Sequence, residues 1–146
     1  MKIEKFAFLG LRFSLAFIFL WAFFDKTFGL GFSTLKTAAW VNGGSPTTGF
    51  LTNAVKGPLA EFFTGLTQIT LGEVILVDWI FMLGLLGVGL SLLLNRFTKW
   101  GSISGVLMMV LMYLAVFPPT TNPLLDDHIV YIFAFLLIGF KSRDRA

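Results

Sequence analysis

The sequence predicts an all-α integral membrane protein, a four-transmembrane-helix bundle whose long first extracytoplasmic loop contains short interfacial helices. Of the 146 residues, 56% are hydrophobic and 13% are charged. A soluble domain of this size leaves about 30% or more of its unfolded chain's surface exposed and could not hide so much apolar surface. The apolar residues also form runs close to the roughly 20 residues that cross a bilayer. We therefore expect one membrane domain over residues 1–146.

The expected spans cover about residues 6–24, 74–94, 100–117 and 124–140. The first run is longer than the apolar region of a usual signal peptide and lacks a small-residue cleavage site. Glycines in the second and third runs predict close approach between neighbouring helices. The fourth apolar run, His128–Phe140, is short, so it spans only if its helix begins near Leu124 or tilts little.

The outer loop is expected over residues 25–73 and contains two helix signals. Ser45-Pro46 is a plausible helix start, as is Gly57-Pro58. The apolar residues after Pro58 recur at helical spacing: Leu59, Phe62, Phe63 and Leu66. This period predicts a short amphipathic helix, either lying in the membrane interface or packed against the bundle.

The orientation follows from the basic residues of the short connections and termini: Lys2, Lys5, Arg96, Lys99, Lys141, Arg143 and Arg145. The third connection has no Lys or Arg and ends in Asp126-Asp127. Basic residues concentrate on the cytoplasmic side of membrane proteins. We expect a multi-pass protein of the cell membrane with both termini in the cytoplasm and the loop over residues 25–73 outside.

This topology brings polar residues that are distant in sequence to the outer end of the bundle. The candidate catalytic residues there are Asp25, Lys26, Asp78, Asp127, His128 and Tyr131. Lys26 would hold an anion, with Asp25 accepting a hydrogen bond or a proton. The alternative is that Asp25 and Lys26 mark the end of the first helix at water. Asp78 either caps the second helix or pairs with Lys26 or His128 across the bundle.

The last three of these candidates suit proton transfer. Asp127 lies four residues and His128 three residues before Tyr131, so all three can share a helical face. A histidine tuned by a carboxylate moves protons near neutral pH. In the alternative interpretation, Asp126 and Asp127 simply cap the fourth helix.

Four further residues are candidates for contact with a cofactor. Arg12 either faces the bundle interior and binds a carboxylate or a cofactor oxygen, or snorkels to the cytoplasmic interface. Trp21, Trp40 and Trp79 are expected on the outer side. They are either anchors of the aromatic belt or a ring-stacking wall for a cofactor.

The composition excludes several kinds of site within the chain. There are no cysteines, which excludes disulfides, iron–sulfur clusters and thiolate zinc sites. The one histidine excludes bis-histidine haem ligation within a subunit, and no metal site is expected. The net charge of +3 comes from Lys and Arg near predicted helix ends, as membrane orientation requires, and does not indicate nucleic-acid binding.

Several segments together resemble the DoxX/DoxD family of small four-helix membrane proteins. They are FLWAFFDKTFGLGFST (19–34), AWVNGGSPTTGFL (39–51), VDWIFMLGLLGVGL (77–90) and NPLLDDHIVY (122–131). The similarity is greatest to members described as the membrane subunit of a thiosulfate:quinone oxidoreductase. The resemblance implies the four-helix bundle, thiosulfate as electron donor, tetrathionate as product and a small DoxA-like partner. It also implies a quinone as electron acceptor, whose reduction takes up two electrons and two protons. Its expected contacts are then Arg12, Trp21, Trp40 and Trp79.

A non-enzymatic protein is the competing hypothesis: a scaffold, a chaperone-like partner, or a binder of a lipid or small molecule. In that case the buried charges serve to fix helix packing. A polar cavity reached from the outer side would favour the redox hypothesis, and tightly paired charges without a cavity would favour the other. The sequence leaves open whether the chain forms a homo-oligomer.

Overall fold

The computed structural model describes residues 2–120, 122 and 124–141. Within that part of the chain, three helices are long and apolar enough to cross a membrane: α1 (Lys2–Phe28), α4 (Leu76–Leu94) and α5 (Thr98–Val116). A fourth helix, α6 (Asp127–Lys141), follows them. The mostly helical chain agrees with the predicted class. Two of the basic residues used for the expected orientation, Arg143 and Arg145, lie outside the described residues.

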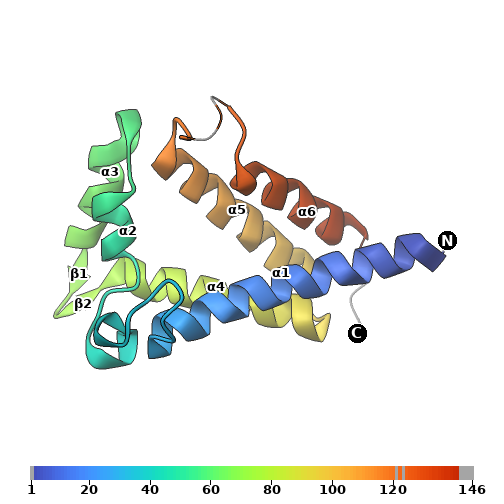
Figure 1. Cartoon of the computed structure of the whole chain (residues 1–146), viewed down its shortest axis with the longest axis horizontal. Coiled ribbons are helices and arrows are strands. Elements are labelled where there is room, and N and C mark those ends of the chain that lie inside the picture. The colour runs from blue at the N-terminus through green and yellow to red at the C-terminus, as the bar shows by residue number, and fades with distance from the viewer. Residues whose placement is uncertain (1, 121, 123, 142–146) are drawn as a thin grey trace.

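The helices pack as two antiparallel pairs. α1 lies along α4, and α5 lies along α6, while α5 leaves the end of α4 at an angle and packs on it near the turn that joins them (Figure 1). Glycines permit two of these approaches: a Cβ atom at Gly89 of α4 would lie 2.6 Å from the Leu20 side chain of α1, and one at Gly105 of α5 would lie 2.6 Å from the Phe135 ring of α6. The predicted close approach at glycines is therefore confirmed at both positions.

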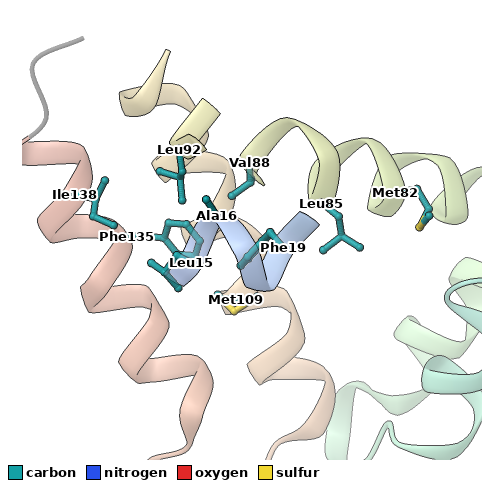
Figure 2. Close-up of a cluster of buried hydrophobic side chains, with 10 residues drawn as sticks. All are labelled: Leu15, Ala16, Phe19, Met82, Leu85, Val88, Leu92, Met109, Phe135 and Ile138. Atoms are coloured by element: carbon teal, nitrogen blue, oxygen red, sulfur yellow. The ribbon is translucent and has the colours of Figure 1, made fainter. Parts of the chain in front are cut away.

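The core lies where α1 crosses the other three helices. There the rings of Phe19 and Phe135 meet edge to face, with centroids 5.2 Å apart. Figure 2 shows the buried side chains that surround them: Leu15, Ala16, Met82, Leu85, Val88, Leu92, Met109 and Ile138. Because each helix contributes to this one cluster, the cluster holds α1 and α6 in the same bundle although they contact each other little elsewhere.

The outward faces of the helices are also apolar. Ile80 on α4 is 63% exposed and Phe140 on α6 is 88% exposed. Similar residues recur on the exposed faces of all four helices, among them Phe6, Phe17, Leu83, Leu107, Phe133 and Leu137. Exposed apolar surface on this scale marks an interaction surface, and hydrocarbon is its natural surrounding.

A long segment between α1 and α4, which we call the outer segment (residues 29–75), folds into short elements at one end of the bundle (Figure 1). These elements are η1 (Lys36–Ala38), η2 (Trp40–Asn42), α2 (Thr48–Asn53), η3 (Gly57–Leu59), α3 (Ala60–Gly65), η4 (Leu66–Gln68), β1 (Thr70–Leu71) and β2 (Val74–Ile75). The two strands pair as an antiparallel hairpin around Gly72.

The outer segment is attached to the end of α5. The backbone N–H of Lys56 donates to the carbonyl oxygen of Ala115 at 3.0 Å. Leu51 and Phe63 pack on Ala115 in a small second core. The helix predicted after Pro58 is present as α3, with Phe63 buried and Phe62 exposed. Its inner face therefore packs on the bundle, while its outer face remains open.

Of the helix boundaries that differ from the predicted ones, two bear on the candidate site. α1 continues to Phe28 instead of ending near residue 24, so Asp25 and Lys26 lie inside the helix. α6 begins at Asp127 and not near Leu124. Its 15 residues extend about 22 Å at 1.5 Å per residue, which is less than the roughly 30 Å hydrocarbon core. The helix begins after Asp126, whose carbonyl and carboxylate oxygens accept hydrogen bonds from the N–H groups of Ile129 and His128.

The packing at Gly105 predicts a difference between two alanine variants. Gly105→Ala places a Cβ against the buried Phe135 ring, whereas Gly87→Ala places one in open space on α4. Both variants gain the same helix propensity, so the difference reports packing alone. We expect Gly105→Ala to be less stable than Gly87→Ala by about 1–3 kcal/mol, measured by unfolding in mixed detergent micelles. Equal stabilities would contradict the α5–α6 interface described above.

Candidate functional site

The Asp25 carboxylate is buried at the end of α1 and faces the chain that follows. It is 1% exposed. Its Oδ2 accepts hydrogen bonds from the backbone N–H of Ser33 at 2.8 Å and the hydroxyl of Ser33 at 2.6 Å, and its Oδ1 accepts one from the N–H of Phe32 at 3.2 Å. A carboxylate near a helix C-terminus is unfavourable for the helix dipole, so these donors are needed to hold it.

A turn at Gly29 makes this return of the chain possible. Gly29 has a φ of +64°, and a Cβ there would lie 2.6 Å from the Cα of Lys36. Only glycine meets both conditions without strain. Asp25 thus serves as the acceptor around which residues 29–34 fold, and it lies neither in water nor in an open site.

Asp78, in the first turn of α4, holds the middle of the outer segment in the same way. It is 5% exposed. Its Oδ1 accepts from the Ser45 hydroxyl at 2.8 Å, the Thr47 hydroxyl at 2.5 Å and the Thr47 N–H at 3.1 Å. The Ser45 hydroxyl oxygen also accepts the N–H of Thr48, which begins α2. The partners recorded for Asp78 are therefore hydroxyls and an amide, not the predicted Lys26 or His128.

The structure gives separate surroundings to Lys26 and to the three tryptophans predicted to contact a cofactor. Lys26 is half-buried next to Asp25. Trp40 meets Trp79 edge to face with centroids 4.8 Å apart, and Trp21 stacks on Phe17. The Trp40–Trp79 pair ties η2 to the start of α4, so these rings join the outer segment to the bundle.

Arg12 lies beside the end of α4 that is away from the outer segment. It is buried, and its guanidinium donates to the side-chain oxygen of Asn95. Asn95 ends α4 in the left-handed conformation, with φ 54° and ψ 40°. Arg12 thus faces the interior, where its recorded acceptor is an amide oxygen, and it supports the α4–α5 turn.

His128 has a carboxylate partner, which is Asp126. The His128 Nδ1 lies 2.7 Å from the Asp126 Oδ2, and the His128 N–H donates to the Asp126 Oδ1 at 3.0 Å. Asp127, the predicted partner, is exposed. Tyr131 packs against the core cluster. The signal that identifies Asp126 is its position before the first turn of α6, from which an Asp side chain reaches the amide two residues on.

His128 and Asp126 line a cavity of about 360 Å³. It lies where the outer segment meets the end of α5 and the start of α6. Its lining residues are Asn53, Ala54, Lys56, Val116, Pro119, Thr120, Asp126, Asp127 and His128. We call this space the His128 cavity. Its volume is at the lower end of the range of small-molecule sites, roughly 300–1,000 Å³.

The His128 cavity combines three kinds of polar group. Lys56 supplies a cation, and Asp126 and Asp127 supply two carboxylates, of which Asp126 orients the imidazole. His128 supplies a group that can give or take a proton. Such a set can bind a small anion and exchange protons with it. Among the described residues, no group of three or more His, Asp or Glu side chains could hold a metal ion.

The structure thus brings some predicted residues together and separates others. Asp127 and His128 share one cavity, whereas Asp25 and Asp78 each bind a different part of the outer segment. Lys56 was not among the predicted site residues. No pattern in the sequence singles it out, because it comes from a loop that reaches α6 only through tertiary packing.

The chain matches no protein-family model, no curated protein and no solved structure.

The Asp78 contacts predict how the outer segment responds to substitution. Asp78→Ala leaves three donors without their acceptor, each costing about 1–3 kcal/mol. We expect trypsin to cleave after the exposed Lys36 and Lys56 at least about tenfold faster, since cleavage follows the population of the open segment. Asp78→Asn should have a smaller effect because its amide oxygen still accepts.

Glu73→Ala is the matched control for this experiment. It removes an exposed carboxylate from the same outer segment, and its cleavage rate should equal that of the wild type. Equal rates for Asp78→Ala and Glu73→Ala would contradict the anchoring role of Asp78.

Proposed function

We propose that the chain is a four-span protein of the cell membrane that takes part in quinone-linked redox chemistry at the His128 cavity. In this proposal both termini are cytoplasmic and the outer segment lies outside. The observation that carries it is the cavity itself, in which a cation, two carboxylates and an imidazole meet at the end of the bundle that bears the outer segment.

Two observations support the fourth span and the common side of the termini. α6 lies along α5 and exposes large apolar side chains, including Val130, Phe133 and Phe140. Lys141 at the end of α6 forms an ion pair with Glu4 near the start of α1. A short helix can cross a bilayer by thinning it locally or by snorkelling its flanking residues.

The resemblance to the thiosulfate:quinone oxidoreductase subunit supplies the reaction. Two thiosulfate dianions would lose one electron each and form a sulfur–sulfur bond, giving tetrathionate. The quinone would accept both electrons and two protons, giving the quinol. Lys56 would attract the dianion, and His128, oriented by Asp126, would pass protons toward the quinone.

The path of the electrons has two versions. Either they pass directly between the bound substrates, or a small DoxA-like subunit supplies a redox cofactor. The His128 cavity lies against the third connection and the outer segment, so both versions place the partner or the anion on the outer side. A homo-oligomer is compatible with either version.

A second candidate function is that of a non-enzymatic scaffold or a binder of a lipid or small molecule. The hydrogen bonds of Asp25 and Asp78 favour it, because each buried carboxylate is held by several donors from the outer segment. Charges of this kind fix packing. On this alternative the His128 cavity binds a small molecule without reducing it.

Quinone reduction by the purified protein in lipid vesicles, with thiosulfate as donor, separates these functions. We expect His128→Ala to lower the rate by about 100-fold, a typical contribution of a general acid–base group. Lys56→Gln should raise the KM for thiosulfate, since Lys56 lines the cavity. Asp25→Asn, in which the amide oxygen still accepts from Ser33, should retain most of the activity.

Lys36→Gln is the matched control for Lys56→Gln, because Lys36 is an exposed cation of the same outer segment away from the cavity. It should leave the KM unchanged. No quinone reduction with or without a co-expressed small subunit, together with no quinone binding, would reject the redox function and leave the second candidate.

A further inference from the structure

A second cavity, larger than the His128 cavity, lies between α4 and α5 at the end away from the outer segment. Its volume is about 530 Å³. It is lined by Leu83, Gly84, Gly87, Val88, Leu90, Ser91, Leu94, Arg96, Phe97, Trp100, Gly101 and Ser104. We call it the α4–α5 groove. From Gly84 to Leu94 it follows α4 for about 15 Å, at 1.5 Å per residue.

The walls of the groove are apolar and its floor is made of small residues. Leu83, Leu90 and Leu94 are exposed along its side. Gly101 lets α5 approach Ser91 of α4, because a Cβ at Gly101 would lie 1.7 Å from the Ser91 hydroxyl oxygen. A Cβ at Gly87, by contrast, would meet nothing within 4 Å. The groove is therefore open at Gly87 and closed at Gly101, where the two helices meet.

One end of the groove is cationic. Arg96 lies in the α4–α5 turn and is exposed. The indole of Trp100, in the first turn of α5, is also exposed. The turn itself is held by the hydrogen bond from Arg12 to Asn95. Arginine and tryptophan at the end of an apolar stretch are the residues that meet lipid headgroups at a membrane interface.

Apart from Asp78 in the first turn of α4, the two helices that this turn joins carry no carboxylate. Between Asp78 and Asp126 the sequence contains no Asp or Glu, so neither α4 beyond its first turn nor α5 offers a counter-ion to Arg96. A second copy of the chain docking through the same face would bring none either. A phosphate group satisfies a guanidinium in two-pronged geometry and brings its own negative charge.

We propose that the α4–α5 groove binds an anionic phospholipid, with one acyl chain in the groove and the phosphate on Arg96. The apolar chain covers Leu90, Leu94 and the Gly87 face, and the headgroup lies beside Trp100. The inference depends on the membrane location of α4 and α5 and not on the redox function, so either can fail while the other stands.

Native mass spectrometry of the purified protein tests it, with phosphatidylglycerol and phosphatidylcholine of matched chains added in equal amounts. The wild type should retain one phosphatidylglycerol in preference to phosphatidylcholine. Arg96→Gln should reduce that preference about fivefold, the effect of one basic residue near an anionic surface. Gly87→Leu, which fills the groove, should reduce retention of both lipids.

Two variants serve as controls. Lys99→Gln removes a neighbouring cation that lines a different cavity, between α5 and α6, and it should keep the preference. Gly10→Leu adds the same side chain at another exposed helical glycine with open space around it, and it should keep both lipids.

Three results would overturn the proposal. One is a wild type without preference for phosphatidylglycerol. Another is an Arg96→Gln variant that keeps the full preference for phosphatidylglycerol. This result alone is sufficient if Gly87→Leu does not elute as a single folded species. The third is a dimer without bound lipid that Gly87→Leu converts to monomer, because the groove would then hold a second copy.

Discussion

A carboxylate buried among apolar helices must have its oxygens hydrogen-bonded, and the structure depends on how that requirement is met at Asp25 and Asp78. Their donors all come from the outer segment: Phe32 and Ser33 for Asp25, and Ser45 and Thr47 for Asp78. An unpaired buried charge is far more costly than the loop order that these bonds require. The two aspartates therefore fold the outer segment back onto the end of the bundle.

That constraint creates the His128 cavity. Once Ser45 and Thr47 are held on α4, α2 follows at Thr48 and carries the chain to Lys56, whose backbone bonds to the end of α5. Lys56 then lines the same space as Asp126 and His128. Asp25 and Asp78 position the outer segment but do not line the cavity. The residues that line it include those that can exchange protons or bind an anion.

Much of the fold is predictable from the sequence because a helix surrounded by lipid must be apolar along its length. The apolar runs correspond to α1, α4 and α5, and the helical spacing after Pro58 corresponds to α3. The hydrogen-bond partner of each carboxylate is not predictable in this way. Asp127 has helical spacing to Tyr131, yet Asp126 binds His128 because the helix begins one residue after it. Lys56 and Asn95 acquire their roles through contacts between segments distant in sequence, which no local pattern records.

The central claim is that small molecules bind at the His128 cavity, and the chain's one histidine makes a direct measurement practical. Protein labelled with ¹⁵N-histidine in lipid nanodiscs gives imidazole signals from His128 alone. Titration with thiosulfate, and separately with a short-chain quinone, should shift these signals in a saturable way, and Lys56→Gln should weaken the thiosulfate response. Imidazole signals that stay unchanged at saturating concentrations of both molecules would contradict the account.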